Sequence, residues 1–192
     1  MDDSKKNMCT VCGGTLTSYG SKMLKDGALC RYCKKKVSEW FSEEALAEMT
    51  AEDIKAHLEY RSQNREALAD FVPMYVAGAK YLLYVDPAND SFLISKKKDF
   101  KTANADILKL TAIKDIRLYT SINEEQNFGD VMIDINMEEG EIKKLSFRVN
   151  EFPGLDLDSE EFSDAKSISL DMAQLFKDCG IDEERIVIEY GK

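Results

Sequence analysis

Four of the five cysteines lie close together near the start of the chain, in two pairs with the same spacing. Cys9 and Cys12 form the first pair, and Cys30 and Cys33 form the second. A gap of two residues lets both sulfur atoms of a pair reach one ion, and two pairs supply the four ligands of a tetrahedral site. Gly13 permits the tight turn that places backbone N–H groups near sulfur after Cys12. The pattern therefore predicts one structural Zn²⁺.

Two other kinds of cysteine chemistry compete with this interpretation. A rubredoxin-like iron site also uses two cysteine pairs, but a glycine usually follows both, whereas Lys34 follows Cys33. A thioredoxin-like redox pair at Cys30 and Cys33 requires a βαβ unit, which the sequence does not predict. Because four thiolates leave no open position on the ion, we expect no catalysis at the metal.

The charge of the chain is distributed unevenly. The sequence has 26 Lys and Arg against 36 Asp and Glu, a net charge of −10. Residues 1–36 contain eight basic and three acidic residues, a net of +5, so the remaining residues carry −15. The acidic part disfavours a general affinity for nucleic acid or anionic membranes. The basic segment leaves nucleic-acid binding through the cysteine module as an alternative function.

Apolar residues make up 44% of the sequence, as in ordinary globular proteins. No apolar run approaches the roughly 20 residues that cross a bilayer. The stretch from Met1 to Met8 is polar and has no hydrophobic signal segment. We therefore expect a cytoplasmic protein without membrane association, a setting in which clustered cysteines favour metal binding over disulfides.

Residues 37–72 predict a helical connector. Thr50-Ala51-Glu52-Asp53 is typical of a capping box, which predicts a helix that begins there and runs to about Asp70. Apolar residues at near-helical spacing predict a shorter helix before it, with one face formed by Val37, Trp40, Phe41, Ala45 and Met49.

Residues 73–192 predict a β-domain with one C-terminal helix. A turn at 86–90 separates strands at 81–85 and 92–94, which predicts a hairpin. Short apolar runs and period-2 alternation predict further strands at 107–110, 116–121, 131–137 and 142–149. Ile142 is out of phase with Leu145, Phe147 and Val149, which suggests a bulge between them.

The C-terminal part follows an acidic loop predicted at 150–163. An amphipathic helix is predicted there, with Gly180 as its C-terminal cap and a final strand at 185–190. Consecutive strands followed by one helix favour an α+β fold built on an antiparallel sheet or small barrel. The apolar face of the helix consists of Ile168, Met172, Leu175, Phe176 and Cys179.

Three motifs in the first 33 residues resemble a family of short bacterial zinc-ribbon-type domains with no assigned function: Cys9-Thr10-Val11-Cys12-Gly13, Leu24-Lys25-Asp26-Gly27 and Cys30-Arg31-Tyr32-Cys33. The resemblance implies zinc binding, and members often precede a helical segment and a second domain. The order of elements after residue 80 resembles the bacterial pleckstrin-homology-like domains of such proteins. Fold analogy does not transfer lipid binding to so acidic a domain.

We therefore expect three parts: a four-cysteine zinc ribbon or treble-clef-like module at 1–36, a helical connector at 37–72, and a pleckstrin-homology-like β-domain at 73–192. His57 is the only histidine, and a packing or solvent-facing role suits its place on a charged helix. The sequence has no phosphate-binding loop and no dinucleotide-binding fingerprint. We expect no catalytic residues. The predicted function is a non-catalytic adaptor that binds a protein or peptide, with nucleic-acid binding and an unrecognised enzyme as alternatives.

Overall fold

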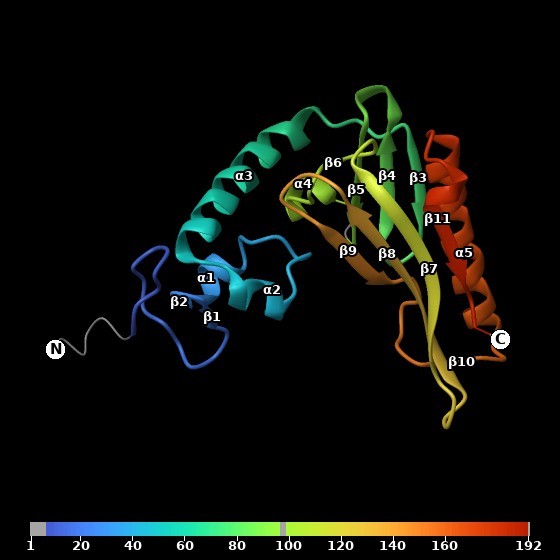
Figure 1. Cartoon of the computed structure of the whole chain (residues 1–192), viewed down its shortest axis with the longest axis horizontal. Helices are drawn as coiled ribbons and strands as arrows, with labels where there is room; N and C mark the ends of the chain where they lie inside the picture. The colour runs from blue at the N-terminus through green and yellow to red at the C-terminus, as the bar shows by residue number, and fades with distance from the viewer. Residues whose placement is uncertain (1–6, 97–98, 192) are drawn as a thin grey trace. The chain divides into compact units, whose positions relative to one another are not determined.

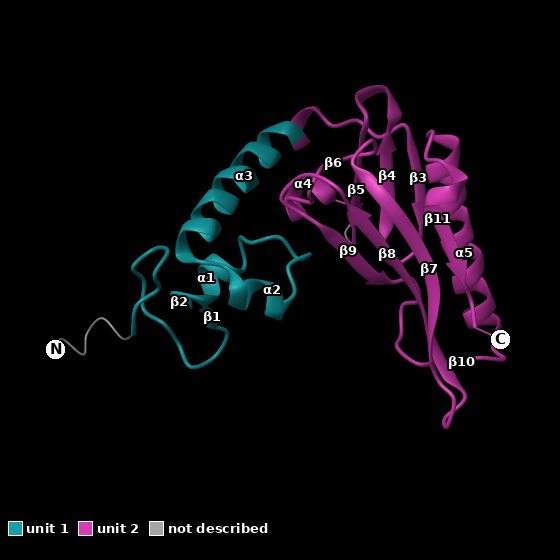
Figure 2. Ribbon diagram, viewed as in Figure 1, with its two compact units in different colours: residues 1–67 teal, residues 68–192 magenta. Residues whose placement is uncertain are grey.

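The computed structural model describes residues 7–96 and 99–191, so the start of the predicted zinc module, residues 1–6, lies outside the described part (Figure 1). The fold is α+β. The chain forms two compact units, residues 1–67 and residues 68–192 (Figure 2). Within the described residues, no helix combines the length and apolar character that a membrane span needs.

The first unit is built on a small hairpin and three helices. Strands β1 (Lys22–Leu24) and β2 (Gly27–Leu29) pair antiparallel, and Lys25 and Asp26 form the turn between them. The helices are α1 (Arg31–Lys34), α2 (Glu43–Glu48) and α3 (Ala51–Asp70).

The predicted helix across 37–49 is wrong in its first half, because α2 begins only at Glu43. The Ser38 hydroxyl oxygen accepts a hydrogen bond from the Trp40 N–H at 3.2 Å, a local bond that competes with helix formation. The Ser42 hydroxyl then caps α2 by accepting from the Ala45 N–H at 3.1 Å. The helix-like spacing of Val37 reflects burial in the core of the unit rather than a continuous helix.

The capping box at the start of α3 is confirmed. The Thr50 N–H donates to Asp53 Oδ2 at 2.7 Å, and the Asp53 N–H donates to Thr50 Oγ1 at 3.2 Å. Asp26 in the hairpin turn accepts from the Ala51 N–H at 2.8 Å, which joins the helix to the hairpin. The helix ends at Asp70, as the sequence predicts.

The second unit contains two sheets. A four-stranded antiparallel sheet has the order β3 (Tyr75–Gly78), β4 (Leu82–Asp86), β5 (Ser91–Ser95), β6 (Leu108–Lys109). The second sheet has the order β10 (Leu155–Asp156), β8 (Phe128–Met137), β7 (Ile113–Asn123), β11 (Ile186–Glu189), and β9 (Lys144–Arg148) also pairs with β8. Shorter elements are α4 (Phe100–Ala103) and the 3₁₀ helices η2 (Pro87–Asn89) and η3 (Glu183–Arg185).

Strands β4 and β5 are buried almost continuously because both faces of their sheet are covered. On one face, Tyr84 and Leu93 pack in a cluster with Phe71 and with Phe100 of α4. On the other face, the ring of Phe92 meets the ring of Phe176 edge-on, with 5.4 Å between centroids. The predicted hairpin is therefore confirmed as the centre of this unit.

The second sheet carries the alternation that the sequence predicts. Val131, Ile133 and Ile135 are buried on β8, as are Leu145 and Phe147 on β9. The predicted bulge after Ile142 is wrong, because β9 begins at Lys144 and Ile142 packs as a buried loop residue. An irregular register occurs instead in β7, between Ile113 and Asp115.

Helix α5 (Glu160–Asp178) begins after its N-cap residue Ser159, so residues 160–163 are helical and not part of the loop that the sequence predicted. Ile168, Leu175 and Cys179 of the predicted face are only half-buried. Gly180 has φ +93°, which confirms the predicted C-terminal cap. The helix contacts β3 and β8, and two open sheets closed by a C-terminal helix are consistent with a pleckstrin-homology-like domain. Its fully buried residues are Phe162, Ala165, Ser169, Met172, Ala173 and Phe176.

Replacement of Phe176 by Asp should unfold the second unit. The change places an unpaired carboxylate at a position that is 1% exposed and removes the contact with Phe92, a loss of about 3–5 kcal/mol in the free energy of unfolding. Thermal denaturation followed by circular dichroism measures the effect. Leu170→Asp is the matched control on the exposed face of the same helix, where Leu170 is 42% exposed. Equal midpoints for the two variants would contradict this account of the core.

Candidate metal centre

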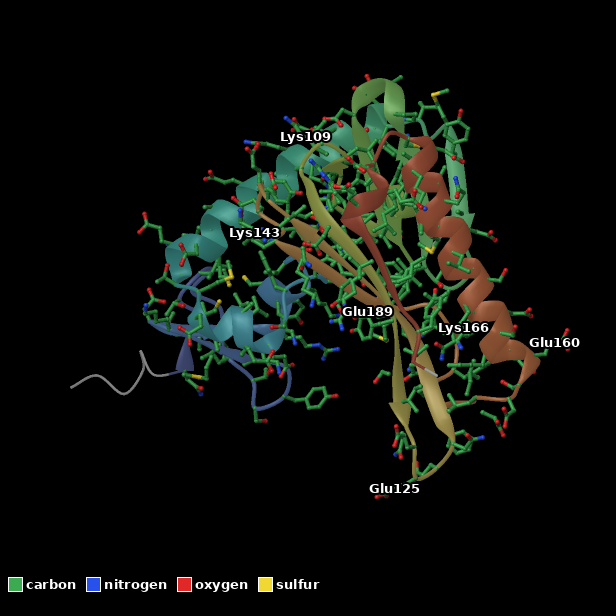
Figure 3. All side chains as sticks on the ribbon, turned by 45° about the vertical axis from the view of Figure 1, so that its right-hand side comes forward. Lys109, Glu125, Lys143, Glu160, Lys166 and Glu189 are labelled. Carbon is green, nitrogen blue, oxygen red and sulfur yellow. The ribbon has the colours of Figure 1, made fainter. Side chains whose placement is uncertain are left out.

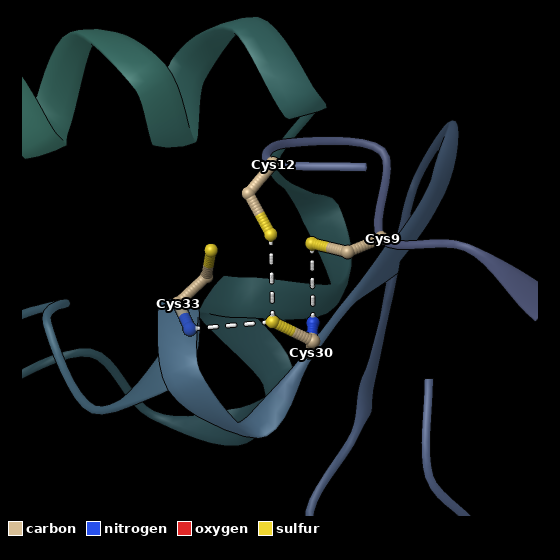
Figure 4. Close-up of side chains that lie close together, drawn as sticks. All are labelled: Cys9, Cys12, Cys30 and Cys33. Carbon is tan, nitrogen blue, oxygen red and sulfur yellow. Dashed lines mark hydrogen bonds between the residues drawn. The ribbon is translucent and has the colours of Figure 1, made fainter. Parts of the chain in front are cut away.

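The four paired cysteines converge on one point. The Sγ atoms of Cys9, Cys12, Cys30 and Cys33 all lie within 4.8 Å of one another (Figure 4). The sulfurs of Cys12 and Cys30 are 3.7 Å apart. A tetrahedron with metal–sulfur bonds of about 2.3 Å has edges of about 3.8 Å, so the cluster is close to the size of one tetrahedral site. The described cysteines form no disulfide, and the four thiols can hold one metal ion.

The first pair belongs to a turn that the backbone determines. The Cys9 N–H donates to the Gly14 carbonyl at 2.7 Å, and the Gly13 N–H donates to the Cys9 carbonyl at 2.8 Å. Gly13 has φ +71°, a left-handed conformation that glycine adopts without strain. The Gly14 N–H then points to Cys12 Sγ at 3.4 Å. These bonds form the metal-binding knuckle that the Cys-x2-Cys-Gly motif predicts.

The second pair lies at the start of α1. Cys30 is the N-cap residue, and the Cys33 N–H donates to its sulfur at 3.5 Å. The Cys30 N–H donates in turn to Cys9 Sγ at 3.3 Å, which connects the two pairs (Figure 4). Each pair thus has a sulfur atom that accepts a backbone N–H, an arrangement that favours negative charge at that atom. Knuckle, hairpin and helix follow in the order of a treble-clef-like module.

Burial and hydrogen bonding act in opposite directions on the thiols. Burial raises the pKa of Cys9, but the N–H donors of Cys30, Cys12 and Val11 outweigh it and lower that pKa to about 7. Burial raises the pKa of Cys33, and the neighbouring side chains of Cys12 and Cys30 raise it further. Metal-free protein therefore retains protons in the cluster, which a metal ion must displace.

Three members of the cluster also belong to the core of their unit. Cys9, Cys30 and Cys33 are at most 5% exposed, whereas Cys12 is open to solvent. The remaining buried members come from both the predicted module and the predicted connector: Leu24, Leu29, Val37, Leu46 and Ile54. With so few apolar side chains, the thiols form a large share of what the unit buries.

Basic side chains near the cluster are partly neutralised. Lys22 of β1 forms an ion pair with Glu43 of α2, and Lys34 Nζ lies 3.5 Å from the same carboxylate. The hydrogen bond from Lys22 is the largest cause that lowers the pKa of Glu43. Glu43 lies outside the module predicted at 1–36, and its carboxylate therefore offsets part of the positive charge that the sequence predicts for that module.

His57 does not contribute to the metal cluster. Its side chain is fully buried on α3, where Nε2 accepts a hydrogen bond from the Ser38 N–H at 3.1 Å. The ring lies 4.6 Å from the Phe41 ring between centroids. Of the packing and solvent-facing roles that the sequence allows, the structure therefore shows packing. Within the described ranges, no second group of Cys, His, Asp or Glu has the geometry of a metal site.

Comparison with known proteins gives one match. Residues 7–57 match the family model described as "Domain of unknown function (DUF4428)". The matched segment contains all four clustered cysteines and extends into α3, which fits a small cysteine-rich N-terminal module. No curated protein and no solved structure matches the chain.

Replacement of Cys12 by Ser should abolish metal binding and disorder the first unit without unfolding the second. Cys12 is the exposed member of the cluster, so its loss removes a ligand without opening a cavity in the core. Elemental analysis gives the metal content, and amide NMR spectra report on each unit separately. Cys179→Ser, at the half-buried cysteine outside the cluster, should change neither. Full metal retention in Cys12→Ser, or collapse of the whole spectrum, would contradict the assignment.

Proposed function

We propose that the cysteine cluster binds one structural Zn²⁺ and that the protein is a non-catalytic adaptor for a protein or peptide partner. The observation that carries the first part is that three of the four clustered cysteines belong to the buried core of the first unit. A cysteine module of about 30 residues buries too little apolar surface to fold alone, so a bound metal supplies free energy of folding directly. Four thiolates saturate the ion, which favours stability over catalysis.

The form of the two pairs favours zinc over iron. Only the first pair forms a knuckle, closed by Gly13, whereas the second pair begins a helix. Two knuckles would surround the ion with a more symmetric set of N–H donors, as a rubredoxin-like iron site requires. A reducing compartment such as the cytoplasm, where we propose the protein functions, keeps exposed Cys12 as a thiolate ligand.

The adaptor role rests on the second unit, which we propose is pleckstrin-homology-like. A four-stranded antiparallel sheet, the consecutive strands β7, β8 and β9, and helix α5 follow in the order that such a domain requires. Strand β11 departs from this pattern by pairing parallel with β7. Edge strand β3 carries Tyr75 and Val76 at about half exposure, and exposed Met74 precedes them. An uncharged apolar edge favours association with another polypeptide.

The zinc site makes a direct prediction about thiol reactivity. The purified protein should contain one zinc ion per chain, and a thiol reagent should modify the four clustered cysteines slowly until a chelator removes the ion. Cys179 is the internal reference, since it lies outside the cluster and should react at the same rate with or without chelator. Rapid turnover of a disulfide substrate by the zinc-loaded protein would instead support a redox enzyme.

Nucleic-acid binding remains the second candidate, favoured by a specific surface of the first unit. Tyr19 is 81% exposed and Tyr32 is 76% exposed. Arg31 precedes Tyr32 in the chain, and its side chain lies near Gly20, which follows Tyr19: an added Cβ atom at Gly20 would be 3.3 Å from Arg31 Cγ. Exposed aromatic rings beside an arginine can stack on unpaired bases. The acidic remainder of the chain opposes this binding.

We expect weak binding to single-stranded RNA or DNA that falls steeply as salt is raised. If Tyr32 stacks on a base, Tyr32→Ala should weaken the binding by about 1–3 kcal/mol, whereas Tyr75→Ala in the second unit should not change it. Fluorescence anisotropy with a labelled oligonucleotide gives both values. Submicromolar affinity at physiological salt would place nucleic-acid binding ahead of the adaptor role.

A further inference from the structure

The second unit contains a half-open cavity of about 740 Å³ at one end of α5. The turn between β3 and β4, the end of β5, the segment that follows β9, and the first half of α5 line it. Figure 3 labels Glu160 and Lys166, which mark this end of the helix. Four segments that are distant in the sequence therefore converge on one space large enough for several amino-acid side chains.

The lining of this cavity has a definite charge pattern. Lys80 and Lys96 contribute positive charge from the sheet side, where the acidic Glu151 also lines the cavity. Glu161 and Asp164 contribute negative charge from α5, where their spacing of three residues places them on the same face of the helix. Apolar side chains complete the lining, with strongly exposed Phe152 among them: Val149, Phe152, Leu155, Ala165 and Ile168.

Contacts with the surrounding structure hold the two lysines in place. Lys80 Nζ donates to the Glu151 carbonyl at 2.9 Å, and Lys96 Nζ lies 4.9 Å from the centre of the Tyr81 ring. Burial lowers the pKa of Lys80, and the charges of Arg148 and Lys96 lower it further, against the opposing effect of Glu151 and Asp130. An additional carboxylate near Lys80 would therefore be stabilised, because the positive charges of Lys80, Lys96 and Arg148 repel one another there.

We infer that this cavity binds a peptide segment in which an acidic and a basic residue flank apolar residues, the acidic side chain facing Lys80 and Lys96 and the basic one facing Glu161 and Asp164. The inference rests on the proposed adaptor function and names the class of partner. A polyanion such as a nucleic acid or an anionic lipid surface would meet repulsion from the carboxylates of α5. A purely apolar segment would cover charged groups without giving them partners, which costs free energy.

The test uses the full zinc-loaded chain labelled with ¹⁵N and titrated with the peptide acetyl-Glu-Leu-Phe-Lys-amide. Saturable shifts are expected in the amides of the cavity segments, including those of Lys80 and Asp164. Three further peptides replace Glu by Gln, Lys by Gln, or Leu-Phe by Gly-Gly. Each of the three should bind more weakly than the first peptide. For the two peptides that lose one charge, the expected loss in affinity is about two- to fivefold, because the ion pairs form at a partly exposed site.

Two variants locate each end of the peptide. Lys80→Gln should remove the preference for Glu over Gln in the peptide while it preserves the preference for Lys, and Asp164→Asn should do the opposite. The matched control is Lys143→Gln, because Lys143 Nζ also donates to a backbone carbonyl, that of Glu138 at 3.4 Å, but lies outside the cavity. Since Asp164 is exposed, its variant remains informative even if Lys80→Gln disturbs the fold.

The inference is overturned if no peptide gives saturable shifts in the cavity up to about 5 mM, or if all four peptides bind equally. It is also overturned if inorganic phosphate or vesicles with anionic lipid bind the same residues more tightly than the charged peptide. These outcomes leave the adaptor function intact, because a partner can bind elsewhere. Cleavage of the peptide, detected by mass spectrometry, would contradict the non-catalytic function instead.

Discussion

The convergence of four thiols is the interaction on which the first unit depends. Three of the four sulfurs belong to residues of the buried core, so the candidate metal site and the packing of the unit cannot be separated. The N–H groups of Gly14, Cys30 and Cys33 all point to sulfur, which orients the cluster before any ion is bound. Burial keeps the cluster compact but raises the cost of ionising Cys33, and a metal ion removes that conflict by replacing the proton.

The second unit is stabilised in a different way. Its core consists of apolar side chains that two sheets and α5 bury together, as in the contact between Phe92 and Phe176. Because this core is apolar, we expect each unit to respond to a different perturbation. Two of its surfaces are an uncharged strand edge at β3 and a cavity lined by side chains of both charges, and we propose both for a polypeptide rather than a polyanion.

Local patterns in the sequence predicted much of this architecture. The capping box at Thr50 and Asp53 located the start of α3, and Gly180 located the end of α5, because such signals act within one helical turn. Period-2 alternation located β8, which is covered on one face. The same reasoning was wrong at 37–42, where local hydrogen bonds of Ser38 and Ser42 replace the helix that apolar spacing predicted.

By itself, the sequence determined the four cysteines of the cluster and the α+β class, since both depend on spacings between residues close in the chain. Only the tertiary structure decided the rest. The parallel pairing of β11 with β7 joins segments about 70 residues apart, and no local signal specifies such a partner. The charged walls around Lys80 and Asp164 likewise arise where distant segments meet. Their chemistry depends on contacts that form only when the whole unit folds.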